Sequence, residues 1–359
     1  MANTIETISY TRSPNKFATI LRKQVHQYFQ TQKLQPTSSP SMKWRLIILS
    51  GMWIGLYTML LTGHLPCAFL VLSMVLFHFV LFQLALTAHD GSHNAVSSNP
   101  KTNKWIYRIF DLAGVNSYLW EFDHVISHHG LPNVSGYDSN MYMYPAIRLD
   151  PYAPKKWFHR YQHIYALFMY AHATLFKVFL ADFVNFKRER IGMIEVGKHP
   201  NKELFYLIGT KAFAISYIYI IPFLFISAPA WQIILSMYVG HLVSGIALGL
   251  IFQVTHTNLL VSQVKPNHQG KISHSYEEHV FSTTADFAVH NKVIAWMTGG
   301  LNIHAVHHMF PNMSQMHLPQ IAKIVRKTCT EHNVPYLEFP TWRTAISSHF
   351  QALKQLGQA

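Results

Sequence analysis

Two long stretches without a single charged side chain constrain this chain more than any other feature. No Lys, Arg, Asp or Glu occurs from Leu46 to His89, and none occurs from Ala212 to Val264. A membrane-spanning helix needs roughly 20 apolar residues, so each stretch is long enough for two crossings. Only 13% of the residues are charged, whereas soluble domains usually carry about twice that share. The sequence therefore predicts an all-α integral membrane protein.

The turns inside these stretches divide them into two hairpins. The segment "TGHLP" separates the first pair of spans and "SAPA" the second, and neither carries a charge. Lys and Arg otherwise gather outside the spans, and positive loops stay on the cytoplasmic side of a membrane. This rule accounts for the net charge of +13 without a nucleic-acid partner. Lys211, near the start of the third span, is expected to extend its ammonium to the surface. The four predicted spans cover residues 46–62, 66–87, 209–228 and 231–252.

The remaining segments are expected outside these spans. Residues 1–41 form a polar lead without a signal-peptide pattern, and residues 42–359 would form one membrane domain with a cytoplasmic helical cap. An amphipathic helix is predicted in the lead, lying on the membrane or packed on the body. Residues 163–184 contain Lys177 and Asp182 and are predicted to be an interfacial helix. The apolar positions of the lead helix share one face: Phe17, Ile20, Leu21, Val25 and Tyr28.

Three clusters of histidine lie near the span ends or beyond them. Within each cluster a four-residue separation places two rings on one helical face. Imidazole suits zinc, copper, iron and nickel. The rings are too numerous for one tetrahedral ion, so the count favours two metals. The clustered residues are His89 and His93, then His124, His128 and His129, and finally His304, His307 and His308.

Other histidines are weaker candidates. His256, just past the fourth span, lies at the depth where His89 follows the second, and is included as a ninth ligand on that ground. His78 and His241 fall inside spans, where polar groups usually have partners, but are not expected to bind metal. Ordinary surface or chance positions are expected for His64, His159, His199, His268, His274, His279, His332 and His349.

The clusters resemble the three histidine boxes of the integral-membrane fatty acid desaturases. The segments that carry the resemblance are "HDGSH", "WEFDHVISHHGLPN" and "GGLNIHAVHHMFP", and the last is most similar to the front-end and linoleoyl-type enzymes. The resemblance implies four spans with a cytoplasmic cap and a di-iron centre held by nine histidines. The ligands it implies are His89, His93, His124, His128, His129, His256, His304, His307 and His308.

Two features depart from the pattern of the front-end enzymes. Many of them carry Gln at the position of His304. Many also carry a fused cytochrome b5 module with a His-Pro-Gly-Gly motif, whereas "KHPNKE" holds the only His-Pro here. Electrons are therefore expected from a separate protein, such as a ferredoxin or a cytochrome b5 with its reductase.

The chemistry of the family explains the other expectations. Removing hydrogen from an unactivated acyl chain requires a strong oxidant made from O₂ at the metals, and a bent apolar tunnel to hold the chain. The acyl group could arrive on a lipid, on CoA or on an acyl carrier protein. Because metal-bound imidazoles usually donate their second N–H to a carboxylate or carbonyl, nearby acids are candidates for that role, and Trp120 and Asn302 for shaping the pocket. The acidic candidates are Asp90, Glu121, Asp123, Asp138 and Asp286.

Two alternatives stay open from the sequence. An acyl hydroxylase or acetylenase would share the histidine clusters, because only the outcome of the oxidation differs. A metal transporter is disfavoured, because transporters place their ligands near the bilayer midplane and these clusters lie at span ends. The active site is expected on the cytoplasmic face, of the inner membrane in a bacterium or of the endoplasmic reticulum in a eukaryote.

Overall fold

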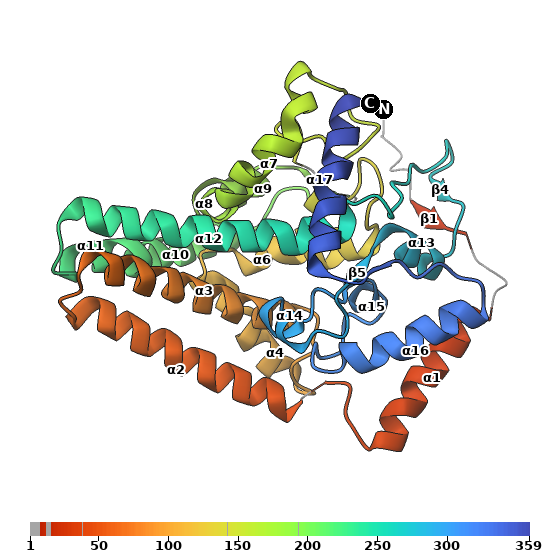
Figure 1. Cartoon of the computed structure of the whole chain (residues 1–359), viewed down its shortest axis with the longest axis horizontal. Coiled ribbons are helices and arrows are strands. Elements are labelled where there is room, and N and C mark those ends of the chain that lie inside the picture. Colours follow the sequence, from red (N-terminus) through yellow and green to blue (C-terminus); the bar gives the residue numbers. More distant parts are fainter. Residues whose placement is uncertain (1–7, 12–15, 38, 142, 193) are drawn as a thin grey trace.

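A computed structural model describes residues 8–11, 16–37, 39–141, 143–192 and 194–359. Its long helices form a bundle at one end, and shorter helices pack together at the other (Figure 1). Four helical segments are long and apolar enough to cross a membrane, as the charge-free stretches predicted. They are α2 (Pro40–Thr62), α3 (Cys67–Ser92), the continuous segment of α10 (Asn201–Ile215), η5 (Ser216–Ile220) and α11 (Ile221–Phe225), and α12 (Ala230–His256).

Helices α3 and α12 form the centre of the bundle. They pack against each other along much of their length, and α2 packs on α3. The turn between α2 and α3 and the turn between α11 and α12 lie at the same end of the molecule (Figure 1). Both central helices run further than expected, so that His89 lies in the last turns of α3 and His256 is the last residue of α12. The two helices therefore deliver these rings to the same end of the bundle.

Residues 163–184 do not form the single interfacial helix that was predicted. The segment Trp157–Ala171 meets the segment Ala173–Phe186 at an angle of 59°, a geometry that fits a broken span or a re-entrant loop. At the bend, Nδ1 of His172 lies 2.8 Å from the carbonyl oxygen of Phe168. A regular helix would use that carbonyl for the backbone N–H of residue 172, but this N–H donates to Met169 instead. The local hydrogen bonding thus interrupts the helix.

This bent segment packs tightly on α12. A Cβ atom at Gly245 would lie 2.3 Å from the carbonyl oxygen of Ala171, and one at Gly249 would lie 2.5 Å from the ring of Tyr170. Glycine at these two positions lets the backbones approach closely. The segment comprises η3 (Trp157–Tyr161), α7 (Gln162–Ala171), α8 (Ala173–Phe176), η4 (Lys177–Ala181) and α9 (Asp182–Phe186).

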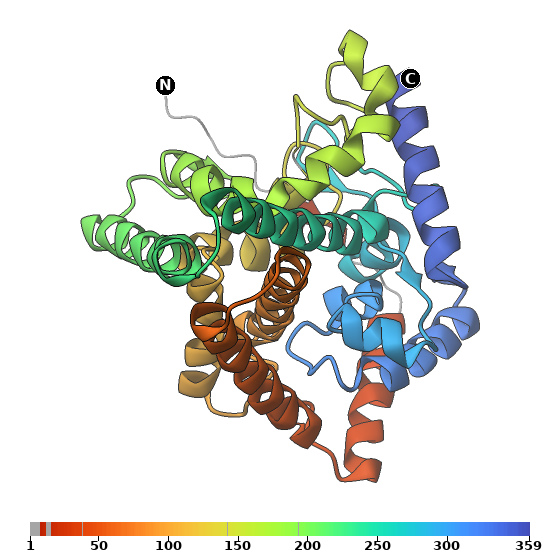
Figure 2. The same ribbon diagram turned by 60° about the vertical axis from the view of Figure 1, so that its left-hand side comes forward.

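The predicted amphipathic helix of the lead is α1 (Phe17–Gln32). It packs on α16 (Leu318–Glu331), and the two helices lie side by side in both views (Figures 1 and 2). Its buried face consists of Phe17, Leu21, Val25 and Phe29. Of the two positions predicted for this helix, on the membrane or packed on the body of the protein, the structure shows the second. The predicted Ile20 and Tyr28 lie at the partly buried margin.

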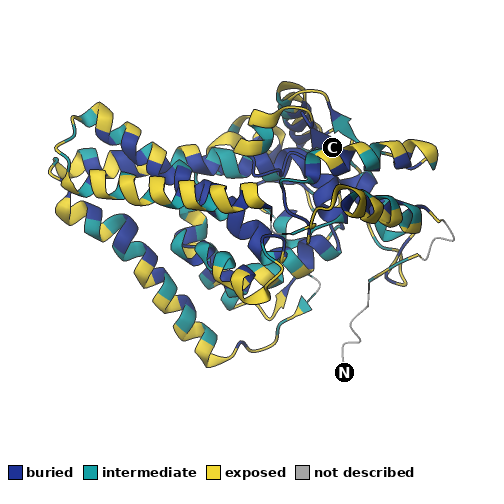
Figure 3. Ribbon diagram, turned by 90° about the horizontal axis from the view of Figure 1, so that it is seen from below, coloured by how far each residue is buried: buried dark blue, intermediate teal, exposed yellow. Residues whose placement is uncertain are grey.

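Short elements complete the part of the chain beyond the bundle. Figure 3 shows exposed residues along the outer faces of the long helices and buried residues where the elements meet. The remaining helices are α4 (Pro100–Tyr107), α5 (Ile109–Leu112), α6 (Ser117–Trp120), η1 (Glu121–His128), η2 (Ser139–Met141), α13 (Tyr276–Thr283), α14 (Lys292–Met297), α15 (His304–Met309) and α17 (Trp342–Gln358). Three two-residue pairs form the described sheets: β1 (Ser9–Tyr10) parallel to β4 (Lys271–Ile272), β2 (Arg190–Ile191) antiparallel to β3 (Ile194–Glu195), and β5 (Asp286–Phe287) parallel to β6 (Glu338–Phe339).

Candidate metal centre

Nine buried histidines meet where α3, η1, α12 and α15 converge. They form two groups, and within each group one ligand atom per residue lies within 4.8 Å of all the others. The first group contains His89, His93, His124, His129 and His307, and the second contains His128, His256, His304 and His308. Every one of the nine histidines selected from the sequence lies in one of these two groups.

The middle cluster divides between the two groups because its helix is a π-helix. Element η1 has π geometry over Glu121–His128, in which backbone hydrogen bonds join residues five apart. His124 and His129, five apart, therefore fall in one group, and His128 falls in the other. The sequence analysis had paired His124 with His128 on an α-helical face, and this pairing is wrong.

The third cluster divides in the α-helical manner. In α15, His304 and His308 are four residues apart and share the second group, whereas His307 enters the first. Two glycines in left-handed conformations precede this helix, Gly299 at φ 60° and Gly300 at φ 76°. A Cβ at Gly299 would lie 2.8 Å from Leu86 on α3. The Gly-Gly turn thus brings α15 close to α3, which carries the first cluster.

The ring nitrogens at the centre lack other partners. Both nitrogens of His129 and of His304 are buried without a hydrogen-bond partner among the described residues, as is Nε2 of His307. Nε2 of His89 lies 2.8 Å from Nε2 of His124, and Nε2 of His308 lies 3.3 Å from Nε2 of His256. Buried polar atoms normally have partners, so nitrogens that converge in this way fit residues around a cation.

Burial favours the neutral form, which is the form that binds metal, for several of these rings. For His124 and His129, burial first and neighbouring histidines second lower the pKa well below the usual value. The same two causes lower the pKa of His304, His307 and His308. A neutral imidazole keeps a lone pair for coordination, so the donor set fits first-row transition metals.

One carboxylate orients a ring of the middle cluster. The carboxylate of Asp138 lies 2.9 Å from Nδ1 of His128 and also accepts from the backbone N–H of Asn133. Asn133 in turn donates to the carbonyls of His256 and Thr283. These contacts tie the loop after η1 to the end of α12. Hydrogen bonds of this kind fix the orientation of a metal-binding ring.

Among the described residues, the other acidic candidates form no hydrogen bond with an imidazole ring. Asp286 accepts from the backbone N–H of Ala305 and from the hydroxyl of Tyr336, and burial raises its pKa to about 7. Asp90 accepts from the backbone N–H of Gln315. These two acids hold the backbone around the site. Asp123 faces a cavity, and Glu121 is exposed.

Trp120 and Asn302 have different positions relative to the site. The ring of Trp120 lies 4.5 Å from that of His124 and lines the cavity. Asn302 is buried in the turn before α15, where its side chain donates to the carbonyl of Phe287 and accepts from Thr298. Trp120 therefore shapes the pocket, and Asn302 holds the turn together.

Sequence reasoning did not find Asn140 and Tyr276. The amide of Asn140 lies 2.6 Å from Nδ1 of His124, and the hydroxyl of Tyr276 donates to the carbonyls of His129 and His308. Tyr276 thus links one residue of each group. Only Asn140 had a sequence signal, because it closely follows the second cluster.

Several histidines expected at the surface are buried instead. His159, His279 and His349 are each 0% exposed and His199 is 6% exposed. Each has a hydrogen-bond partner, such as the carbonyl of Pro132 for His279. These four histidines are buried singly and belong to neither of the two histidine groups. The exposed positions expected for His64, His268 and His274 are observed.

Lys211 does not reach the surface. It is 3% exposed, and its ammonium lies 2.6 Å from the carboxylate of Asp182. The sequence analysis had predicted that the ammonium of Lys211 reaches solvent, but a buried carboxylate on the neighbouring segment is its partner instead.

His78 and His241 lie outside both groups, with their rings 4.5 Å apart inside the bundle.

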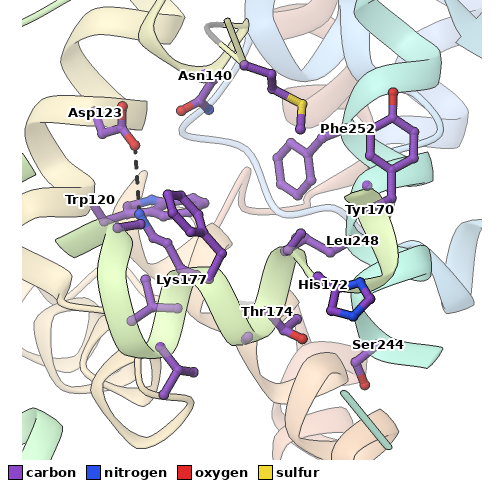
Figure 4. A pocket seen from close by; sticks show the side chains of 18 of the residues that line it. Trp120, Asp123, Asn140, Tyr170, His172, Thr174, Lys177, Ser244, Leu248 and Phe252 are labelled. Carbon is purple, nitrogen blue, oxygen red and sulfur yellow. Dashed lines mark ion pairs between the residues drawn. The ribbon is translucent and has the colours of Figure 1, made fainter. Parts of the chain in front are cut away.

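A cavity of about 670 Å³ runs from the histidines into the bundle. His89, His128 and His256 line it at the metal end, and His78 and His241 line it further along α3 and α12. Figure 4 shows Phe252, Leu248 and Tyr170 on one side and Trp120, Asp123 and Lys177 on the other. The cavity is mainly apolar and is lined by successive residues of α3 and α12, which suits a hydrocarbon chain.

Four candidate spans and two groups of buried imidazoles define a membrane protein with a histidine-rich metal site. Comparison with known proteins specifies this class further. The sequence profile of the family described as "Fatty acid desaturase" matches residues 63–340. The chain belongs to the fatty acid desaturase family, and it is an oxidoreductase that acts on fatty acyl chains.

Individual relatives are similar over nearly the whole chain. An acyl-lipid (8-3)-desaturase of Physcomitrium patens is 30% identical over 98% of this chain and 74% of its own length. An sn-1 linoleoyl-lipid 6-desaturase of Synechocystis is 27% identical over 99% of both chains. An acyl-lipid (8-3)-desaturase of Mortierella alpina is 30% identical over 96% of this chain and 78% of its own length.

Proposed function

We propose that the protein is an O₂-dependent acyl-lipid desaturase whose nine clustered histidines hold two iron ions. The observation that carries this proposal is the division of nine buried rings into two adjacent groups, of five and of four. Two bound irons would supply the oxidising power, drawn from O₂ and external electrons, that removes two hydrogens from an acyl chain. Imidazole ligands bind either iron or zinc, so the ligands alone do not select the metal. The oxidation that the family performs requires a redox-active metal and therefore favours iron.

The residues of the chain hold and orient this centre. His89, His93, His124, His129 and His307 would bind one iron, and His128, His256, His304 and His308 the other. Asp138 accepts a hydrogen bond from Nδ1 of His128 and would leave Nε2 free to bind a metal. The side chain of Asn140 also holds the ring of His124, since its amide nitrogen lies 2.6 Å from Nδ1 of that ring. The buried surroundings exclude water from the reacting chain.

The cavity is the evidence for an acyl substrate, and the names of the relatives are the evidence for the group that carries the acyl chain. The relatives named above are acyl-lipid and linoleoyl-lipid enzymes, so a membrane lipid is the proposed carrier. Acyl-CoA and acyl carrier protein are the competing carriers. A ferredoxin or a cytochrome b5 with its reductase would supply the electrons.

The proposed topology places both hairpins in the membrane and the metal centre at the cytoplasmic face. Residues 1–41 would be a cytoplasmic lead, and residues 42–359 a membrane domain with a helical cap. The support is the distribution of charge, since positive loops stay in the cytoplasm and the two turns at the far end of the bundle carry none. In a bacterium the membrane would be the inner one, and in a eukaryote the endoplasmic reticulum.

Expression in a host of known lipid composition, followed by fatty-acid profiling, tests the proposal. The expected result is a new double bond at one position, found in glycerolipids, and absent when His308→Ala replaces the wild type. A hydroxylated or acetylenic product would identify the alternative outcome of the same chemistry. An unchanged lipid profile, with the protein present in the membrane and an electron donor co-expressed, would overturn the proposal.

A further inference from the structure

A cluster of four charged side chains lies beside the metal centre, and two of its members, Asp123 and Lys177, line the cavity. Lys177 and Lys211 are its cations, and Asp123 and Asp182 are its anions. Asp182 is 0% exposed at its side chain and pairs with both lysines. Charged groups within the apolar part of a membrane protein are costly and frequently functional, so each lysine needs an explanation.

The donors of Lys211 are fully used. Its ammonium lies 2.6 Å from Asp182 and donates to the carbonyls of Gly114 and Lys177 at 2.5 and 3.0 Å. An ammonium has three N–H donors, so Lys211 has a complete set of partners. Its contacts join α10 to the loop after α5 and to η4, and a structural role accounts for it.

Lys177 has donors to spare. Its ammonium lies 3.2 Å from Asp182 and 3.8 Å from Asp123, and the second distance is too long for a hydrogen bond. The side chain is 17% exposed and lines the cavity. Figure 4 shows it rising from its helix toward Asp123 beside Trp120. At least one N–H therefore faces the space that an acyl chain would fill.

The position of Lys177 relative to the metal centre is fixed by one aromatic ring. Its ammonium lies 5.9 Å from the centre of the Trp120 ring, and the Trp120 ring lies 4.5 Å from that of His124. One indole thus separates this cation from the first histidine group. A polar atom bound to Lys177 would hold the chain only a few carbons away from the metals.

The charge balance favours a neutral oxygen as the bound atom. Two lysines offset two aspartates in the cluster, and Asp123 faces the cavity close to Lys177. A phosphate bound to Lys177 would be repelled by the negative charge of Asp123. A neutral carbonyl oxygen would not be repelled in this way and needs only a hydrogen-bond donor to bind. The carbonyl of an ester or thioester is also common to lipid, CoA and carrier-protein substrates.

We propose that Lys177 binds the carbonyl oxygen at C1 of the acyl chain and so fixes the site of oxidation by counting from the carboxyl end. This inference rests on the proposed desaturase function. It makes Lys177 a determinant of bond position and gives a role to a cation that lines a mainly apolar cavity.

The test uses full-length protein in membranes, supplied with acyl chains of 16, 18 and 20 carbons. In the wild type, the new double bond should lie at the same distance from C1 in every chain. Lys177→Met should reduce product at limiting substrate by about tenfold or more, the loss expected for a charged hydrogen bond, and yield several positional isomers. Lys177→Arg, which keeps a charged donor, should recover positional fidelity.

An ether analogue without the carbonyl separates recognition from folding. The wild type should use the ether about tenfold less well than the ester, whereas Lys177→Met should not distinguish them. Lys187→Met, an exposed neighbour that does not line the cavity, is the matched control and should behave as wild type. Comparison of ester and CoA thioester identifies the carrier.

The outcomes distinguish this inference from the function on which it rests. A wild type whose double bond keeps a constant distance from the methyl end would overturn the role of Lys177. A Lys177→Met variant that still prefers the ester to the ether as strongly as the wild type does would also overturn it. If Lys177→Met does not fold, the chain-length series and the ether comparison in the wild type decide the question. A wild type that makes no unsaturated product from any chain would overturn the proposed function itself.

Discussion

The carboxylate of Asp138 lies 2.9 and 3.0 Å from Nδ1 of His128, with both side chains buried. This contact fixes which ring nitrogen carries the proton, so Nε2 faces the second histidine group. The same carboxylate accepts from the backbone of Asn133. One acid therefore orients a metal-binding ring and shapes the loop that follows it.

Replacing Asp138 should weaken metal binding. Asp138→Asn should lower affinity for iron about 10- to 100-fold, the usual loss when the partner of a metal-bound histidine is removed. Iron per protein after dialysis against a weak chelator measures the effect. Glu121→Gln is the control, because Glu121 is exposed. Equal iron retention in the two variants would remove Asp138 from this role.

His256 provides a direct test of the ligand set. His256→Ala should abolish turnover and lower iron content, as should His308→Ala, because both rings belong to the group of four. His274→Ala should keep wild-type iron, since His274 is exposed. Protein should be made in iron-rich medium, because zinc binds imidazole sites more tightly than ferrous iron. Two irons and normal turnover in His256→Ala would exclude His256 as a ligand.

Cysteine labelling can establish the topology. Single cysteines at His64 and Pro229 should react from one side of the membrane, and cysteines at Pro100 and the exposed His268 from the other. The native Cys329 should stay silent, because burial raises its pKa to about 12 and little thiolate exists below pH 9. Cys67 is partly exposed and must be replaced first. Labelling of positions 100 and 268 from opposite sides would contradict the two-hairpin topology.

The contact between the bent segment and α12 should be sensitive to a single methyl group. Gly245→Ala would place a Cβ 2.3 Å from a backbone oxygen of Ala171, so α7 must move away. We expect a lower thermal midpoint in detergent and reduced activity. Gly209→Ala is the control, because nothing lies within 4 Å of its Cβ position, and alanine favours a helix. A Gly245→Ala variant as stable as Gly209→Ala would show that the contact is loose.

The sequence predicted four helices long and apolar enough to cross a membrane and the histidines that cluster, because both depend on local composition and spacing. Absence of charge over a long stretch is sufficient to predict a membrane helix. The assignment of each ring to a group could not be predicted, since it depends on the π geometry of η1. Lys211 was misplaced for a similar reason, because its partner Asp182 is distant in sequence and nothing local reveals it.

The shared use of η1 and α15 has a consequence for how the centre fills. Each element sends rings to both groups, through His124 and His128 on η1 and through His307 and His308 on α15. A metal in one group therefore orders the backbone that presents ligands to the other, so the second ion should bind with less ordering cost than the first. We expect cooperative uptake in which half-filled protein is scarce, with the two ions acquired and lost together.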